Sequence, residues 1–146
     1  MKVFEEIILG FEILVNKGYI HRDIKPANVL VKNRHYKVAD FGFATRADVL
    51  GRKKMTDICG TPLYMAPQLL KNQPYTTKSD IWSLGLMLYE MIFSYPPWPC
   101  RSLNEYINGI LYTPLKFPYN AKIGVHTKDF IKRSLVTNEA QRMSWQ

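Results

Sequence analysis

Near the start of the chain, apolar residues recur every three or four positions from Val3 to Lys17. This spacing predicts one amphipathic helix, and Gly18 directly after it is a common stop signal. Two shorter apolar runs follow at Val29–Val31 and Tyr36–Ala39, with a polar turn at 32–35 between them. We interpret these runs as the two strands of a β-hairpin joined by that turn.

A longer stretch, Ile81–Phe93, is apolar on nearly every side of a helix. Ser79 and Asp80 directly precede it and are candidates for capping it. A helix that is apolar all round is expected inside a protein core. Thirteen residues that include Glu90 are too short and too polar to cross a bilayer, so we expect no membrane insertion.

The last third of the chain is predicted to contain two further helices. Prolines at positions 96, 97 and 99 end the apolar helix, and Ser102 with Glu105 forms a capping box for a helix through about Leu111. The next helix is expected to begin near Thr127 and to carry on one face its apolar residues Phe130, Ile131 and Leu135. The pattern as a whole predicts a mainly α-helical domain with one short β-hairpin.

Composition narrows the possible partners and the cellular location. The 146 residues, 47% of them hydrophobic, suffice for one domain with a core. The net charge of +8 comes from scattered basic residues without a nucleic-acid-binding motif, so we expect no nucleic-acid partner. Residues 45–56 are polar and basic, which predicts a mobile surface loop. Cys59 and Cys100 show neither metal-ligand nor disulfide spacing, which favours a reducing, cytoplasmic location.

Two polar motifs carry the candidate chemistry. The sequence HRDIKPAN occupies residues 21–28, and DFG follows at residues 40–42. Phosphoryl transfer needs little covalent help but much positioning and charge neutralisation, which carboxylates, an amide and a cation supply. Together the two motifs resemble the catalytic loop and the metal-binding motif of eukaryotic protein kinases.

The resemblance implies a role for each polar residue of these motifs. Asp23 is expected to orient the incoming hydroxyl and accept its proton, while Lys25 neutralises charge on the transferred phosphate. Asn28 and Asp40 are expected to hold Mg²⁺ together with the phosphates of ATP, so we expect no all-protein metal site. Mg²⁺ is thus the implied cofactor, and ATP and a protein are the implied substrates.

The resemblance also implies supporting contacts around the catalytic loop. His21 is expected to pack inside the loop and shape it, and Asp80 to hydrogen-bond the backbone at His21 and Arg22. Residues 59–67, CGTPLYMAP, resemble the end of a kinase activation segment, where the substrate backbone docks. The lysine of the catalytic loop and the Gly-Thr pair at 60–61 are typical of the serine/threonine-specific branch.

One departure from the family pattern concerns an expected ion pair. Gln68 stands where the family usually has Glu, and the expected partner of that residue is Arg142. We expect a neutral hydrogen bond between Gln68 and Arg142 in place of a buried salt bridge.

A second departure concerns regulation. Asp57 stands four residues before Thr61, where many family members carry a phosphothreonine that pairs with the arginine of the catalytic loop, here Arg22. Asp57 would then partly mimic the phosphorylated residue. The alternative is that Asp57 is a solvated loop residue and the neighbouring Thr56 is the phosphorylation site.

The resemblance covers essentially the whole chain, but only one lobe of a kinase. It implies a mainly α, kinase-like C-terminal lobe, a helical bundle whose short hairpin carries the catalytic and metal-binding loops. A glycine-rich loop and its paired lysine, which belong to a small β-rich lobe, are absent, so we expect residues 1–146 to be a partial domain. The sequence QRMSW at 141–145 is expected to begin the last helix of the lobe, which the chain leaves incomplete.

Two functions are open at this point. The first is a serine/threonine protein kinase that transfers the γ-phosphate of ATP to a protein hydroxyl, with this fragment weak or inactive alone. The second is a truncated pseudokinase that acts as a non-catalytic interaction module, using exposed apolar lobe surface to bind a partner. The submotifs at 40–45, 63–67 and 142–145 are similar to those of Unc-51-like kinases.

Overall fold

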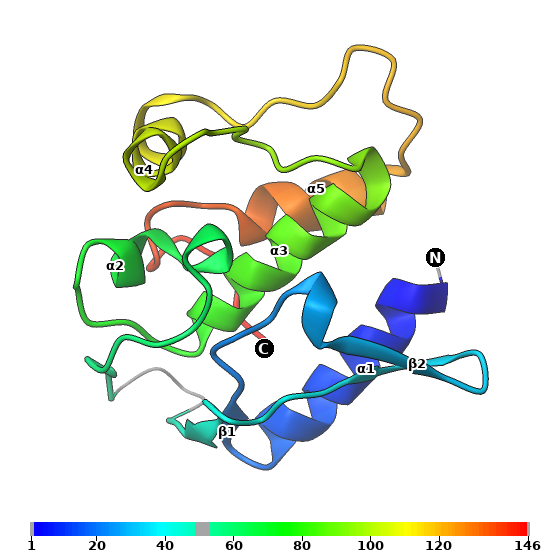
Figure 1. Ribbon diagram of the computed structural model, residues 1–146, viewed down its shortest axis with the longest axis vertical. Helices are drawn as coiled ribbons and strands as arrows, with labels where there is room; N and C mark the ends of the chain where they lie inside the picture. Colours follow the sequence, from blue (N-terminus) through cyan, green and yellow to red (C-terminus); the bar gives the residue numbers. More distant parts are fainter. Residues whose placement is uncertain (1, 49–52, 146) are drawn as a thin grey trace.

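A computed structural model describes residues 2–48 and 53–145, and it is mainly helical (Figure 1). The helices in this part of the chain are α1 (Lys2–Asn16), α2 (Pro67–Leu70), α3 (Lys78–Phe93), α4 (Leu103–Tyr112) and α5 (Val125–Ser134), with short 3-10 turns η1 (Pro26–Asn28) and η2 (Pro62–Tyr64). Strands β1 (Tyr19–Ile20) and β4 (Thr45–Arg46) form one antiparallel pair, and β2 (Val29–Lys32) and β3 (His35–Val38) form another. Within the described residues, no helix is both long and apolar enough to cross a membrane.

Helix α3 forms the centre of the molecule, as its all-round apolar pattern predicts. Its residues from Ser79 to Tyr89 are buried, and α5 runs alongside it in Figure 1. The two helices cross closely at Gly85, where an added Cβ would collide with the Ser134 hydroxyl. The capping prediction was wrong, because the helix begins at Lys78 and Asp80 lies inside its first turn, with its carboxylate directed at another loop.

Helix α1 has the bounds that its apolar spacing predicts, to within a residue, and it packs against the β-hairpin. Phe4, Ile7 and Phe11 are buried on the inner face. Glu6 accepts a hydrogen bond from the backbone N–H of Tyr36 at 2.7 Å. This bond ties the helix to the outer edge of β3 and fixes the hairpin in place.

The predicted hairpin is confirmed, and it brings the two motifs together. Val29 pairs with Val38, and the two residues of the turn, at positions 33 and 34, have φ values of 52° and 63°. Positive φ at both positions is the geometry of the tight turns that match strand twist. At the open end of the hairpin, the Ala39 N–H donates to the Asn28 carbonyl at 2.8 Å. Asn28 and Asp40 therefore lie at neighbouring ends of the two strands.

The segment expected to be a loop over 45–56 begins instead with a strand. Thr45–Arg46 pairs with Tyr19–Ile20, and the Ala47 N–H donates to the Gly18 carbonyl at 2.9 Å. The Arg46 guanidinium also lies over the Tyr19 ring, which adds a side-chain contact between the two strands. Residues 49–52 of the same prediction lie outside the described residues.

The C-terminal third follows the sequence pattern except at its end. Helix α4 begins as its capping box predicts, with the Ser102 hydroxyl accepting from the Glu105 N–H at 3.2 Å, and α5 begins two residues before Thr127. The predicted helix at 141–145 was wrong, because these residues form a turn followed by irregular chain. The Arg142 N–H bonds to the Asn138 carbonyl, but no run of successive helical hydrogen bonds follows in the described residues.

Candidate active site

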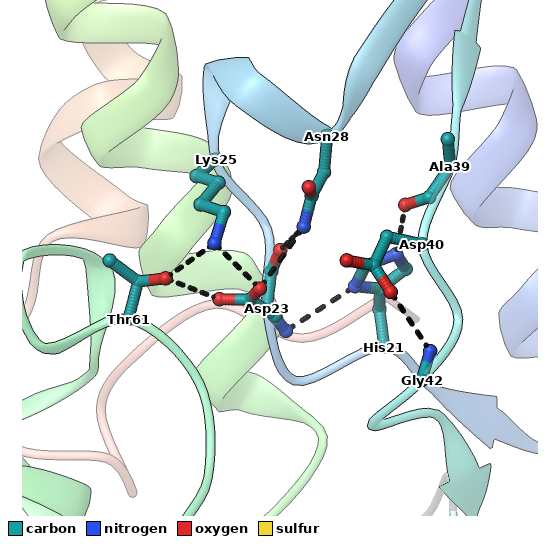
Figure 2. Close-up of polar contacts among 8 residues, drawn as sticks. All are labelled: His21, Asp23, Lys25, Asn28, Ala39, Asp40, Gly42 and Thr61. Atoms are coloured by element: carbon teal, nitrogen blue, oxygen red, sulfur yellow. Dashed lines mark hydrogen bonds and ion pairs between the residues drawn. The ribbon is translucent and has the colours of Figure 1, made fainter.

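The Asp23 carboxylate lies at the centre of a polar cluster in the loop between β1 and η1 (Figure 2). It is buried and pairs with the Lys25 ammonium at 2.8 Å. The Thr61 hydroxyl donates to its other oxygen at 2.7 Å, and the Asn28 side-chain amide donates at 3.1 Å. Burial alone would raise the pKa of Asp23, but these hydrogen bonds and the Lys25 charge outweigh it and hold the pKa below its ordinary value. Asp23 is therefore ionised at neutral pH.

Thr61 links the activation segment to this loop. Its hydroxyl accepts a hydrogen bond from Lys25 Nζ at 2.7 Å while it donates to Asp23, so one hydroxyl joins both charged groups (Figure 2). The preceding Gly60 has a φ of 108°, and a Cβ there would collide with the Arg22 carbonyl. Glycine at position 60 thus allows the segment to pass directly against the catalytic loop.

Asn28 and Asp40 have oxygen atoms suited to a hard cation. The Asn28 side-chain NH₂ group donates to Asp23, and among the described residues no hydrogen bond is made to the side-chain oxygen Oδ1 of Asn28. Asp40 is exposed, has a φ of 60° and uses one carboxylate oxygen to accept from the Gly42 N–H at 3.2 Å. In the described part of the chain, no three His, Cys, Asp or Glu side chains cluster to form a metal site. This donor set fits Mg²⁺ that takes its remaining oxygen ligands from nucleotide phosphates and water.

Asp80 of helix α3 holds the backbone of the catalytic loop through two hydrogen bonds. Its two carboxylate oxygens accept from the His21 N–H at 2.7 Å and from the Arg22 N–H at 2.9 Å. Burial raises the pKa of this carboxyl, and the two hydrogen bonds oppose the shift. The His21 ring is fully buried, with one nitrogen near the Ala39 carbonyl at 3.2 Å and the other accepting from the Asp23 N–H at 3.3 Å. Asp80 therefore contacts the backbone of the catalytic loop, and His21 contacts the backbone of that loop and of Ala39, directly before the DFG motif.

The Arg22 side chain reaches away from Asp23 toward the activation segment. Its guanidinium pairs with the Asp57 carboxylate and donates from Nε to the Phe43 carbonyl at 2.7 Å. The pair holds the pKa of Asp57 below its ordinary value. Thr56 next to it is exposed. The third partner of Arg22 is the Tyr75 hydroxyl at 3.4 Å, a residue that no sequence motif singled out.

Two further hydrogen bonds between distant segments were not predicted from the sequence. The Tyr64 hydroxyl donates to Glu90 of α3 at 2.6 Å, and the Tyr106 hydroxyl of α4 donates to the Leu63 carbonyl at 2.6 Å. These two bonds hold the turn η2, in which the chain leaves the activation segment. Nothing in the spacing of the residues indicates such partners, because they come from three separate elements.

Gln68 and Arg142 are paired as the sequence predicts. Arg142 is buried and donates from Nη2 to Gln68 Oε1 at 2.9 Å, and its other N–H groups donate to the carbonyls of Val136 and Lys78. Burial lowers the pKa of Arg142 to about 10. The Gln68 amide nitrogen donates in turn to the Thr137 carbonyl at 2.7 Å. The buried cation is thus held by neutral oxygens.

We therefore expect Gln68→Glu to raise the melting temperature. A carboxylate would give the Arg142 guanidinium a charged partner, and the expected gain in free energy of unfolding is about 1–3 kcal/mol. This is less than the roughly 3–5 kcal/mol lost when a buried pair is broken, because Gln68 already supplies one acceptor and because glutamate loses the amide hydrogen bond to the Thr137 carbonyl. Thermal and denaturant unfolding would measure the change, with Gln73→Glu as the control, since Gln73 is exposed. An unchanged melting temperature would contradict the expectation.

The sequence of the chain is similar to those of known protein kinases. A model of the protein kinase domain matches residues 1–146. The chain is 37% identical to the serine/threonine-protein kinase fused of Drosophila melanogaster, over 99% of the chain and 18% of that protein. It is 34% identical to the serine/threonine-protein kinase ATG1a of Arabidopsis thaliana, over 96% of the chain and 23% of that protein.

Relatives from other kinase groups match equally well. The cAMP-dependent protein kinase catalytic subunit of Dictyostelium discoideum is 35% identical over 94% of the chain and 20% of that protein. The chain spans about a third or less of the length of the curated relatives it matches. Its motifs, its site geometry and the match along all its residues place it in one family: the chain belongs to the protein kinase domain family.

Proposed function

We propose that this chain contributes the catalytic loop of a serine/threonine protein kinase, which transfers the γ-phosphate of ATP to a protein hydroxyl. The observation that carries the proposal is the ionised Asp23 carboxylate, held between Lys25 and Thr61 and next to Asn28, whose side-chain oxygen accepts no hydrogen bond from the described residues. A surface used only for protein interaction has no need of a buried carboxylate with a lowered pKa.

Each residue of the cluster has a defined task in this proposal. Asp23 accepts the proton of the attacking hydroxyl and directs its lone pair at the phosphorus, and Lys25 stabilises the charge that spreads over the phosphoryl oxygens. Mg²⁺ and ATP, when bound, supply the transferable phosphoryl group and neutralise its charge. Asn28 and Asp40 are the residues that would hold the ion. Asp80 and His21 keep the loop backbone in the required shape.

The proposed activity belongs to the protein that carries this chain. We infer that residues 1–146 form the C-terminal lobe of a kinase domain, since the relatives extend well beyond the matched region. Assignment to the Unc-51-like group is part of the proposal and is supported by the similarity to ATG1a.

The two unpaired cysteines are compatible with a reducing cytoplasmic location. A protein substrate and a second partner on the exposed lobe surface follow as further expectations.

A phosphotransfer assay tests the proposed function. The longest natural form of the protein that contains this chain is incubated with γ-labelled ATP, Mg²⁺ and peptides that offer serine, threonine or tyrosine. We expect label on serine or threonine, weak or no transfer by residues 1–146 alone, and loss of transfer when Mg²⁺ is chelated. ATP binding without any transfer would favour the pseudokinase, and label on tyrosine would overturn the assigned specificity.

The Arg22–Asp57 pair leads to a prediction about regulation. Because Asp57 already occupies the acidic position facing Arg22, we propose that the segment is ordered without phosphorylation. Asp57→Ala is then expected to lower phosphotransfer by about tenfold, the usual order of such coupling. Thr56→Ala is the matched control and is expected to leave the rate unchanged. The reverse result would identify Thr56 as the regulatory site.

A further inference from the structure

The side chain of Tyr75 lies where the activation segment meets the start of α3. It is fully buried, and its backbone forms an isolated β-bridge with Met55, with N–H to carbonyl distances of 2.8 and 3.0 Å. Its hydroxyl donates to the backbone carbonyl of Asp57 at 2.7 Å and receives the Arg22 guanidinium at 3.4 Å. One residue outside the catalytic motifs therefore contacts both members of the Arg22–Asp57 pair.

These contacts connect the pair to the most rigid part of the fold. Tyr75 lies three residues before the first residue of α3, and α3 holds the Arg22 backbone through Asp80. The Arg22 backbone and the Asp57 backbone are thus both fixed from the beginning of one buried helix. In contrast, the Asp57 side chain is 65% exposed, and an ion pair at that exposure is weak on its own.

We propose that Tyr75 is a positioning residue, whose hydroxyl holds the Asp57 backbone and the Arg22 guanidinium in register so that the activation segment stays docked without a phosphate. The proposal deepens the proposed function and rests on it for its catalytic meaning. The docking itself is a property of the chain and is measurable without ATP. The simpler possibility is that Tyr75 only fills the core and that its hydroxyl bond is incidental.

Tyr75→Phe separates these possibilities, because it keeps the buried ring and removes only the hydroxyl. The matched control is Tyr89→Phe. The hydroxyl of Tyr89 donates to the carbonyl of Lys116 at 3.0 Å, in the chain between α4 and α5 and outside the activation segment. Both variants lose one hydroxyl from a largely buried tyrosine. They therefore differ in which segment loses its hydrogen bond.

The first readout is amide hydrogen exchange of the 146-residue chain. In Tyr75→Phe, the amides from Met55 to Gly60 are expected to exchange about five- to tenfold faster, the effect of losing one hydrogen bond that restrains local opening. Trypsin cleavage after Lys53 and Lys54 is expected to accelerate in parallel. In Tyr89→Phe, both rates are expected to match those of the unchanged protein.

The second readout is the titration of the Asp57 carboxyl, followed by carbon NMR. In Tyr75→Phe, its apparent pKa is expected to rise toward the ordinary value, because the guanidinium is no longer held against it. Among the described residues, the other charged or titratable groups that line a cavity with Asp57 or interact with it electrostatically are the same in both variants. They are Lys17, Arg46, Asp48, Lys53, Lys54 and Cys59. A purely structural loss would lower the melting temperature without moving this titration.

Two results would overturn the proposal. One is an unchanged exchange rate from Met55 to Gly60 in Tyr75→Phe, and the other is an Asp57 titration that does not move. If instead the exchange and titration change as expected while no phosphotransfer is found, the docking role stands and the proposed function fails. If phosphotransfer is found while the exchange and the Asp57 titration are unchanged in Tyr75→Phe, the proposed function stands and the docking role of Tyr75 fails.

Discussion

Asp23→Asn is expected to lower the turnover number for phosphotransfer by about 10²–10⁴-fold, the typical contribution of a general base. Asparagine has the same shape and keeps one oxygen for the Lys25 ammonium, while the Thr61 hydroxyl, which contacts the other carboxylate oxygen of Asp23, can accept a hydrogen bond from the amide NH₂ group. It carries no negative charge and cannot accept a proton at neutral pH. Geometry is thus preserved while the chemistry is removed, which makes this the most direct test of the site.

The kinetic pattern of this variant distinguishes a catalytic role from a structural one. Because the proposed role of Asp23 is to act on the attacking hydroxyl, the KM for ATP is expected to stay close to that of the unchanged protein while kcat falls. Asp129→Asn on α5 is the control, because that carboxylate is 59% exposed. A loss of less than about tenfold in kcat would contradict the assigned role.

Asp80→Ala is expected to cause the largest loss of stability among the site residues. It leaves the buried N–H group of His21 and the partly buried N–H group of Arg22 without this acceptor. Each such donor costs about 1–3 kcal/mol, so the free energy of unfolding is expected to fall by about 2–6 kcal/mol. Denaturant unfolding with a fitted midpoint and slope would measure it.

Two further variants sharpen this prediction. Asp80→Asn keeps one acceptor oxygen and is expected to lose less stability than Asp80→Ala. Asp129→Ala, which removes an exposed carboxylate of an i,i+4 pair, is expected to change stability by about 0.5 kcal/mol or less. Equal losses in Asp80→Ala and Asp129→Ala would show that the two backbone hydrogen bonds have little energetic importance.

The parts of the site that the sequence predicted are those encoded in one short stretch. Asp23, Lys25 and Asn28 lie within six residues, so the geometry of a single loop brings them together. The hairpin adds Asp40, because its apolar alternation and turn fix which strand ends are neighbours. Asp80 could be assigned only through the family resemblance, since 57 residues separate it from Asp23.

The parts of the site that were not predicted from the sequence depend on contacts between residues that are far apart along the chain. Thr61 was expected in the activation segment, but its hydroxyl bond to Asp23 spans 38 residues. Tyr75 looks like any core tyrosine, and its two polar partners come from separate segments. The expected helix at 141–145 fails for the opposite reason, because local propensity there gives way to the tertiary contacts of Arg142 with Gln68 and Lys78.

The start of α3 fixes both the catalytic loop, through Asp80, and the activation segment, through Tyr75. The site and the core are consequently expected to unfold in one transition, without a separate earlier melting of the site. A molecule that binds only the folded site would then raise the melting temperature of the whole chain. For this chain, thermal denaturation can therefore serve as a general assay for ligands of the catalytic loop, with no need to observe turnover.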